Sequence, residues 1–594
     1  MAVNNKNVNP KPKVGVLLRV LKLVKPFRLV FAAATFLALI LAVLAPLRPF
    51  LVSITVDSYI LNFDMKGLQT MAAILVGVLL VESFLRYFFI YMTNWLGQSI
   101  IKGLRVRVFN HLVDQKPQFF DKTPIGTSTT RTINDVETIN DIFSQGLITI
   151  IADLLTLFAV IGFMLYQDWK LTLVSLVTFP LLIYSTYVFK ENIKKAFNDV
   201  RTQVARMNAF LQEHISGMRI IQIFAAEKRE MKRFDEINNN HKQANINAIL
   251  YYSIFFPVVE VILASAIGLM VWYGTNSVIN YETTLGILIA FILYLNMLFR
   301  PLRMLADKFN SLQMGIVASE RVFGLLDNVQ KIDNNGSLKP KKIEGRVKFE
   351  NVWFAYENDD FVLKNINLEI QPGQSVAIVG ATGSGKSSII NVLARFYEFQ
   401  KGDIKLDGIS IRDYDIYTLR KYFGIVMQDV FLFSGSIMDN ITLNNPDISR
   451  EQVINAAKEA GAHEFILKLP LGYDYKVMER GLTLSMGQRQ LISFVRALVY
   501  NPQILILDEA TSSIDTESEM IIQHATEKLI TNRTSIVVAH RLSTIKKADV
   551  IVALQKGEII EIGNHDDLMK SDGYYKKLHD MQFSKQLITD DNIT

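Results

Sequence analysis

The chain has 594 residues, of which 50% are hydrophobic and 20% are charged, and its mean hydropathy is +0.22. This composition is too apolar for a disordered chain and unusual for a wholly soluble one. The formal net charge of +6 is modest for this length, so we expect no nucleic-acid partner. Since the chain contains no cysteine, disulfide scaffolds, thiol catalysis and cysteine-ligated metal sites are excluded.

Long apolar segments dominate the chain before about residue 330. Each can cross a hydrocarbon core of about 30 Å, which requires about 20 residues. A soluble helical core could account for one such run, but not for so many. We therefore predict an all-α transmembrane domain of six helices, at residues 29–57, 70–96, 141–166, 169–190, 249–274 and 284–305.

The distribution of basic residues predicts how these helices are oriented. Residues 1–28 carry seven Lys or Arg and no acid. The short loops on one side contain a single lysine, Lys66, whereas the two long loops after Leu96 and Lys190 are rich in Lys and Arg. Basic loops remain in the cytoplasm. We therefore expect a multi-pass protein of the cell (inner) membrane with both termini cytoplasmic.

The two long loops have a helical pattern of their own. Apolar residues recur at helical spacing in 97–115 and 190–234, with few Gly or Pro. The spans are therefore expected to continue as helices beyond the membrane. Pro117 and the Thr123–Gly126 stretch predict a break and a turn in the first loop.

From Gly345 the pattern changes to short β-type runs that alternate with helical segments, as in an α/β domain. Three clear runs are 347–354, 375–379 and 504–507. The predicted limits are a basic N-terminus 1–28, a transmembrane domain 29–326, a linker 327–344, a nucleotide-binding domain 345–584 and a polar tail 585–594.

A glycine-rich loop follows the second of these strands. Residues 380–387 read Gly-Ala-Thr-Gly-Ser-Gly-Lys-Ser, which fits GxxxxGK[ST]. Glycines allow backbone N–H groups to turn toward phosphate oxygens, Lys386 can reach the β and γ phosphates, and the Ser387 hydroxyl can bind Mg²⁺. The helix that begins here directs its positive end at the anion. The motif predicts a nucleotide site.

Two acids end another apolar strand. Ile504–Leu507 is followed by Asp508 and Glu509. Acids at the end of a buried strand bind a metal, act in catalysis, are protonated, or simply occupy a helix N-terminus. The chain also carries the glycine-rich loop 380–387, which we call the phosphate loop. We therefore predict that Asp508 binds Mg²⁺ and that Glu509 orients or deprotonates the attacking water.

Between these motifs lies Leu484-Ser485-Met486-Gly487-Gln488, which resembles the Leu-Ser-Gly-Gly-Gln signature of ATP-binding-cassette (ABC) proteins. Other residues resemble further family motifs. They are Tyr356 (adenine-stacking aromatic), Gln428 (Q-loop), Glu479–Gly481 (exporter X-loop), Asp515 (D-loop) and His540 (switch histidine). Three of these residues could instead have no role in ATP binding: Tyr356 could be a core aromatic, Gln428 a surface residue and His540 a hydrogen-bonded histidine at a strand end.

The resemblance extends into the membrane half. Residues 119–135 are similar to the first cytoplasmic loop of ABC exporters, and 213–227 to the second. The chain thus resembles a half-size exporter of the bacterial multidrug and lipid-flippase group, with six spans followed by one ATPase domain. The residues concerned in the first and second loops are Phe119, Phe120, Asp121, Gly126, Arg131, Asn134, Asp135, Glu213, Gly217, Phe224 and Glu227.

The resemblance implies an ATP hydrolase with ATP and Mg²⁺ as cofactors, in which two chains sandwich two ATP molecules. It implies catalytic roles for Glu509, His540, Lys386 and Gln428, and Mg²⁺ contacts for Ser387, Gln428 and Asp508. ATP contacts are implied for Tyr356, Gly380, Ala381, Thr382, Gly383, Ser384, Gly385, Lys386, Ser387, Ser388, Ser485, Gly487, Gln488 and Asp515. The implied function is export or flipping of an amphipathic lipid or drug, with membrane lipids around the protein.

Two questions stay open at this point. Met486 replaces the first signature glycine, although the glycine whose N–H approaches phosphate is intact, so we expect ATP binding to survive. The cargo is undetermined: charged residues within spans suggest function but could also pair with each other. These are Arg48, Glu82, Arg86, Asp153 and Glu260, with Asn94 and Asn296 as polar partners, while Arg300 and Arg303 lie near the inner end of the sixth span. Two alternatives to a lipid or drug exporter built from identical chains remain. The chain could be one catalytically competent half of a heterodimeric exporter, or it could export peptides.

Overall fold

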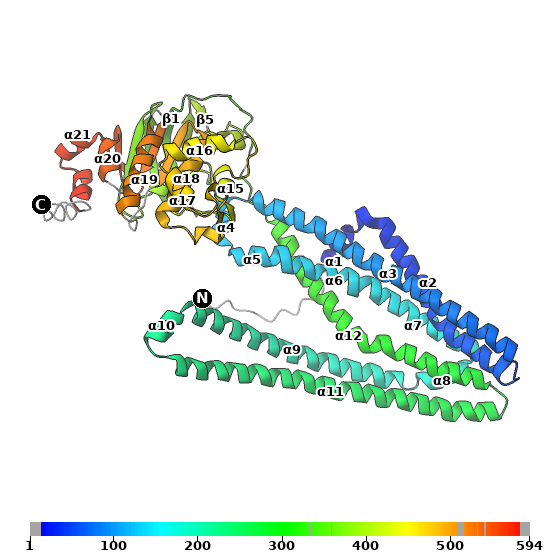
Figure 1. Ribbon diagram of the computed structural model, residues 1–594. Coiled ribbons are helices and arrows are strands. Elements are labelled where there is room, and N and C mark those ends of the chain that lie inside the picture. The colour runs from blue at the N-terminus through cyan, green and yellow to red at the C-terminus, as the bar shows by residue number, and fades with distance from the viewer. Residues whose placement is uncertain are drawn as a thin grey trace. The chain divides into compact units, whose positions relative to one another are not determined.

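A computed structural model describes residues 14–332, 334–357, 359–508, 516–531, 533–539 and 542–581 (Figure 1). The chain divides into two compact units. The helical unit contains the chain up to Asp114 together with Thr123–Val329. The sheet unit contains the short segment Gln115–Lys122 and the chain from Gln330 onward. The sheet unit thus includes a piece of the first long loop.

Long helices build the helical unit, and they coincide with the predicted apolar segments. Within the described residues, five stretches are long and apolar enough to cross a membrane, and the sixth predicted span falls on the shorter apolar stretch Leu285–Pro301. The five stretches are Lys25–Ile60, Met65–Val113, Ile125–Gln167, Trp169–Ser216 and Glu227–Ile279. The helices are α1 Val14–Lys22, α2 Arg28–Thr55, α3 Met65–Val113, α5 Ile125–Thr130, α6 Val136–Asp141, α7 Leu147–Gln167, α8 Trp169–Leu176, α9 Phe179–Ser216, α10 Met218–Ile223, α11 Glu227–Ile279 and α12 Leu285–Asp327.

Several of these helices are much longer than a bilayer is thick. At about 1.5 Å per residue, the 53 residues of α11 extend about 80 Å, compared with about 30 Å of hydrocarbon. The expected continuation beyond the spans is therefore present. The short helix α10 joins the far ends of α9 and α11, which run side by side (Figure 1).

The break predicted at Pro117 and Thr123–Gly126 is also present. Helix α3 ends at Val113, the short α4 occupies Pro117–Lys122, and α5 starts at Ile125. Proline begins α4, where its missing N–H costs nothing.

The sheet unit has an α/β core, as predicted. A six-stranded sheet has the order β12-β11-β3-β10-β9-β6, and an antiparallel sheet has the order β2-β1-β4-β5. The strands are β1 Val347–Ala355, β2 Phe361–Ile370, β3 Ser375–Val379, β4 Lys401–Leu406, β5 Ile409–Ser410, β6 Phe423–Val426, β7 Gly435–Ser436, β8 Lys476–Val477, β9 Ile504–Asp508, β10 Thr534–Val538, β11 Val550–Gln555 and β12 Glu558–Gly563. The helices are α4, α13 Lys386–Leu393, α14 Ile416–Lys421, α15 Ile437–Thr442, α16 Arg450–Glu459, α17 His463–Lys468, α18 Met486–Tyr500, α19 Thr516–Ile530, α20 Leu542–Lys547 and α21 His565–Lys570.

The parallel strands are buried on both faces, which explains their continuous apolar sequences. Because side chains alternate along a strand, Leu505 and Leu507 enter one core and Ile504 and Ile506 the other. The first core includes residues of α15, α16 and α18, and the second includes residues of α13 and the antiparallel sheet. The central sheet is thereby fixed between two layers.

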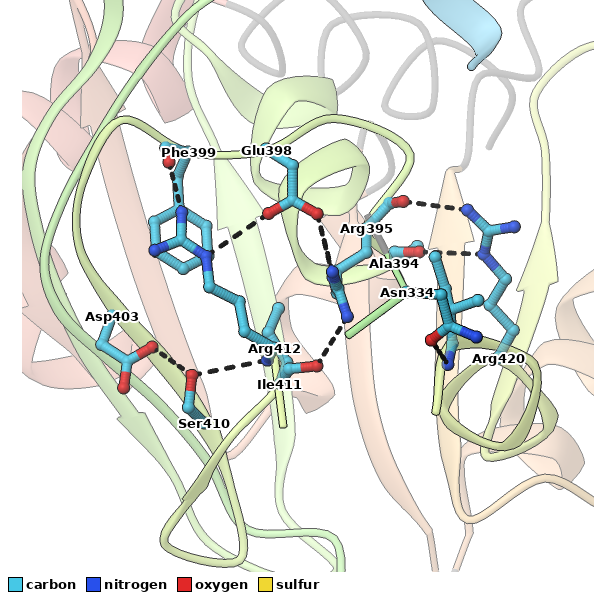
Figure 2. A network of polar contacts seen from close by, with 11 residues as sticks. Asn334, Ala394, Arg395, Glu398, Phe399, Asp403, Ser410, Ile411, Arg412 and Arg420 are labelled. Carbon is cyan, nitrogen blue, oxygen red and sulfur yellow. Dashed lines mark hydrogen bonds and ion pairs between the residues drawn. The ribbon is translucent and has the colours of Figure 1, made fainter. Parts of the chain in front are cut away.

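A buried polar network closes the carboxyl end of α13 (Figure 2). Arg395, 2% exposed, donates to the Glu398 carboxylate at 2.9 and 3.1 Å and to the Ile411 carbonyl at 3.1 Å. Arg420 donates to the Arg395 carbonyl at 2.9 Å, so a cation lies where the helix dipole is negative. Arg412 contacts Glu398 and lies over the Phe399 ring. The network anchors α13 to the antiparallel sheet.

Candidate functional site

The candidate site lies along the carboxyl edge of the six-stranded sheet. Strands β3, β10, β9 and β6 are neighbours and parallel, so their carboxyl ends share one edge. Val538 pairs with both Ile378 and Asp508, and Val426 pairs with Leu507. The phosphate loop, Gln428 and Asp508 therefore emerge at the same edge, where α/β folds bind ligands.

The phosphate loop joins β3 directly to α13, as the motif predicted. Gly385 has φ of 106°, a conformation that favours glycine, and it precedes the first residue of α13, Lys386. A Cβ at this position would lie 2.9 Å from the Leu363 side chain and 3.2 Å from the Val362 carbonyl. Glycine is therefore required both by the turn and by the close approach of β2.

Lys386 is buried within this loop. Its ammonium donates to the carbonyl oxygens of Gly380 at 2.8 Å and Ala381 at 3.1 Å. Burial lowers the pKa of Lys386, and the charge of Asp508 partly opposes that shift. Neutral carbonyls compensate a buried cation incompletely, so an anion in the loop is favoured. This is the chemistry that a nucleotide phosphate supplies.

The serines of the loop differ in exposure. The Ser387 side chain is exposed at the start of α13, whereas Ser384 and Ser388 are buried. The Ser384 hydroxyl is buried and has no hydrogen-bond partner among the described residues. Ala381, Thr382 and Gly383 form the exposed tip of the loop. The exposed hydroxyl is the one predicted to contact Mg²⁺.

Tyr356 is joined to the helix that follows the phosphate loop. Its hydroxyl lies 3.1 Å from the Ser388 hydroxyl and accepts a hydrogen bond from the Asn391 amide at 3.0 Å. Its ring packs edge-on against Phe354 and Tyr397, with centroids 4.7 and 5.0 Å away. The side chain remains half-buried. A structural role is thus evident, and adenine stacking stays a prediction.

Two further predicted residues sit at the strand ends. Gln428 is exposed two residues after β6, and Asp508 is half-buried as the last residue of β9. Carboxylate, amide and hydroxyl oxygens suit Mg²⁺. Glu509, Asp515 and His540 lie outside the described residues, and their roles stay predictions.

The signature residues begin α18. Ser485 is its N-cap and forms a capping box with Gln488: the Ser485 hydroxyl accepts from the Gln488 N–H at 3.2 Å, and the Gln488 side chain accepts from the Ser485 N–H at 3.0 Å. Met486 is 38% exposed, whereas Gly487 is buried. Among the described hydrogen bonds and ion pairs, none joins Ser485, Gly487 or Gln488 to the phosphate loop.

Helix α4 contacts the tyrosine of the candidate site. Gln118 donates to the Tyr356 carbonyl at 3.1 Å, and Asp121 accepts a hydrogen bond from the Tyr397 hydroxyl. Lys122 pairs with Glu357 at 2.6 Å, which lowers the pKa of the Glu357 carboxyl. Tyr397 was not found by sequence reasoning, because no local pattern indicates its contact with a loop so distant in the chain.

Comparison with protein families identifies both halves. Residues 31–302 match the ABC transporter transmembrane region, and residues 363–512 match the family described as ABC transporter. The two matches are fused in one chain, in the order that the sequence motifs predicted.

Curated proteins match over nearly the whole chain. An uncharacterized ABC transporter ATP-binding protein of Bacillus subtilis, YknV, is 37% identical over 95% of this chain and 94% of its own length. A protein named ATP-dependent lipid A-core flippase, from Syntrophus aciditrophicus, is 36% identical over 97% and 96%. A Bacillus subtilis protein named for multidrug export, YgaD, is 37% identical over 96% and 100%. The chain therefore belongs to the ABC transporter family, as a half-size, multi-pass membrane exporter with an ATP-hydrolysing domain.

Proposed function

We propose that this protein uses ATP to export or flip an amphipathic lipid or drug across the cell membrane. The observation that carries the proposal is the sheet edge where the phosphate loop, Asp508 and Gln428 emerge together, in a chain that also carries apolar helices. The relatives named for lipid A-core flipping and multidrug export support this cargo class. The basic loops favour cytoplasmic termini, so ATP would be used on that side.

We assign the ATP-binding roles as follows. Lys386 and the N–H groups of 380–388 bind phosphates, and Tyr356 stacks on adenine. Mg²⁺ would be held by Ser387, Asp508 and Gln428 together with ATP phosphates. Within the described residues no group of three or more acidic or histidine side chains forms a metal site. Mg²⁺ in nucleotide sites is usually bound through one or two carboxylates, and phosphates and water complete its shell.

Hydrolysis requires an oriented water and compensation of the charge on the transferring phosphoryl group. We assign the first role to Glu509 and propose that His540 and Gln428 assist it. Bound Mg²⁺ would neutralise charge on the phosphates. Lys386, preceded by a loop of backbone N–H groups, supplies fixed positive charge at the same place.

We propose that the working unit is a homodimer. Ser485 and Gly487 have no described bond to the phosphate loop of their own chain, yet the family signature contacts ATP. A second chain would bring its signature, together with Asp515, to this loop, and ATP would join the two. The residue limits 29–326, 327–344 and 345–584 for membrane domain, linker and nucleotide-binding domain are part of this proposal.

The test is Mg²⁺-dependent, vanadate-sensitive ATPase activity of the full chain in lipid nanodiscs, measured beside Glu509→Gln. We expect robust activity in the wild type and its loss in the variant, with binding of a fluorescent ATP analogue retained. Unchanged turnover in Glu509→Gln would remove this residue from catalysis. A folded wild type that binds ATP without hydrolysing it would indicate a missing partner chain and refute the homodimer.

A further inference from the structure

Exposed methionines gather in the sheet unit. The chain has 19 methionines and no cysteine, so its sulfur chemistry is that of the thioether. Methionine is one of the residue types most often buried, yet five methionines of the sheet unit are 38% to 70% exposed. These five are Met427, Met478, Met486, Met520 and Met581. The other two methionines of the unit, Met438 and Met569, are half-buried.

Four of the five exposed methionines adjoin a predicted nucleotide motif. Met427 directly precedes the Q-loop glutamine, and Met478 directly precedes the X-loop. Met486 lies within the signature, and Met520 follows the D-loop aspartate, on α19. Single exposed apolar side chains scattered over a surface are ordinary. Their grouping at these motifs places oxidisable sulfur beside the proposed ATP contacts.

Met486 has the most sensitive position of the four. It is the first residue of α18, where the family signature has glycine. The Ser485 hydroxyl is already used, because it accepts from the Gln488 N–H at 3.2 Å. Among the described hydrogen bonds, none uses the N–H of Gly487. An N–H group in the first turn of a helix has no partner within the helix and attracts an anion. The Met486 thioether thus adjoins the N–H group that the signature offers to phosphate.

A hydroperoxide converts a thioether into a sulfoxide. With hydrogen peroxide, a sulfur lone pair attacks one peroxide oxygen, an S–O bond forms and the O–O bond breaks. The second oxygen takes up the proton of the first and leaves as water. Sulfur loses two electrons, and the peroxide is reduced by the same two. Methionine sulfoxide reductases reverse the change, with a dithiol as the reductant.

At Met486 the new oxygen would compete with the γ-phosphate of the partner's ATP. The sulfoxide oxygen carries partial negative charge and accepts hydrogen bonds, so it takes the N–H groups of the first turn and repels phosphate oxygens. We infer that Met486 is an oxidation site at which a hydroperoxide switches off the ATPase reversibly. This inference rests on the proposed function and adds a regulation of the same site.

The experiment treats the full chain in lipid nanodiscs with hydrogen peroxide. Peptide mass spectrometry measures the sulfoxide at each methionine, and ATPase activity is measured before treatment, after it, and after repair by a methionine sulfoxide reductase. Because the chain has no cysteine, neither the peroxide nor the dithiol acts on a thiol of this protein.

The test variant is Met486→Leu, since leucine is close to methionine in volume and forms no sulfoxide. The matched control is Met581→Leu, at an exposed methionine beside no motif. A second control keeps Met486 and combines Met427→Leu, Met478→Leu and Met520→Leu. Each protein is compared with its own untreated activity.

We expect peroxide to lower wild-type ATPase activity about tenfold, the effect of losing one hydrogen bond to a charged group. The loss should follow the sulfoxide at Met486, and the reductase should reverse it. Met486→Leu should keep most of its activity, whereas both controls should lose theirs as the wild type does. A Met486→Leu protein inhibited like the wild type would overturn the inference. So would a wild type that stays active with Met486 oxidised, or one in which Met486 resists oxidation.

A second readout does not depend on hydrolysis. A non-hydrolysable ATP analogue with Mg²⁺ should slow sulfoxide formation at Met486 several-fold, because the partner's nucleotide would cover the signature. The rate at Met581 should not change. Equal rates at Met486 with and without the analogue would overturn the inference, together with the proposed place of the signature. ATPase activity lost in Glu509→Gln would still uphold ATP hydrolysis in that case.

Discussion

Gln118 donates a hydrogen bond to the backbone carbonyl of Tyr356 at 3.1 Å, although the two residues lie 238 positions apart in the chain. The Tyr356 ring in turn packs on Tyr397, whose hydroxyl bonds Asp121. Helix α4, a segment of the first long loop, thus holds both the backbone and the ring of the predicted adenine-stacking residue. We therefore expect a change in Tyr356 on nucleotide binding to reach α4.

We predict that Gln118→Ala weakens this coupling. One hydrogen bond of this kind contributes about 1 kcal/mol, so the fold should survive its loss. The expected result is retained ATP binding with a several-fold loss of substrate-stimulated ATPase. It is measured in nanodiscs as the ratio of stimulated to basal turnover, after titration with a fluorescent ATP analogue.

The control for this change is Gln555→Ala. Gln555 is an exposed glutamine at the end of β11. It should leave the ratio unchanged. A Gln118→Ala protein with the wild-type ratio would show that the α4 contact does not transmit nucleotide binding.

Ser485 has a structural and a proposed functional role that two substitutions separate. Alanine removes the N-cap of α18, which costs about 1 kcal/mol, whereas aspartate is as good an N-cap as serine. Aspartate would also place a negative charge where the γ-phosphate of the partner's ATP is proposed to bind. We therefore expect Ser485→Asp to unfold at the wild-type temperature and to lose ATPase activity, measured by thermal scanning and phosphate release.

Ser449 provides the matched control, because it forms the same capping box with Gln452 at the start of α16. Ser449→Asp should keep both stability and ATPase activity. If Ser485→Asp hydrolyses ATP like the wild type, the signature serine does not face a phosphate. If Ser449→Asp is also inactive, the effect is structural and not specific to the signature.

The surroundings of His565 predict that the stability of the protein depends on pH. Its ring nitrogen lies 2.7 Å from the Tyr575 hydroxyl. Burial lowers the pKa of His565, Lys546 and His579 lower it further, and Asp566 opposes them. The unfolded chain therefore binds more protons than the folded chain just below the unfolded pKa of about 6.5. This contribution is complete above that pH and is lost as the pH falls toward the folded pKa.

The measurement is the thermal midpoint of the full chain from pH 7.5 to 5.5, beside His565→Gln. The variant should show a shallower fall of the midpoint on acidification, because glutamine does not titrate. His463, which contacts the Tyr473 hydroxyl at 2.9 Å, offers the matched variant His463→Gln. Parallel curves for wild type and His565→Gln would contradict the assignment.

Local motifs allowed much of the site to be predicted, because strand, loop and helix of residues 375–393 are contiguous in sequence. The same holds for Asp508, whose apolar strand precedes it directly. The contact between Gln118 and Tyr356 was not predictable, since no local periodicity encodes a pairing across 238 residues. The capping box of Ser485 and Gln488 is also local, because its Ser-x-x-Gln spacing is typical of a helix N-terminus. Contacts between residues that are close in the sequence could therefore be predicted, whereas contacts between distant segments could not.

Substitution of Glu398 tests the polar network that anchors α13, the helix that follows the phosphate loop (Figure 2). Its carboxylate is an acidic partner of Arg395, whose side chain is 3% exposed. Removing one partner of a buried ion pair costs about 3–5 kcal/mol, because the other charge stays buried and unpaired. Glu398→Ala should therefore lower the thermal midpoint and weaken ATP binding, since α13 carries Lys386. Because Glu398 is partly exposed and also contacts Arg412, we expect the loss in free energy of unfolding to lie toward the lower end of that range.

We attribute the predicted loss of stability in Glu398→Ala to the broken ion pair and not to the lost side-chain volume. Arg395→Met combined with Glu398→Leu removes both charges, and such replacement is often neutral. The double variant should thus be more stable than Glu398→Ala, and it should recover ATP binding. Glu369→Ala, on the exposed face of β2, should have no measurable effect. A double variant less stable than the single one would mean that Arg395 acts through its bond to the Ile411 carbonyl rather than through Glu398.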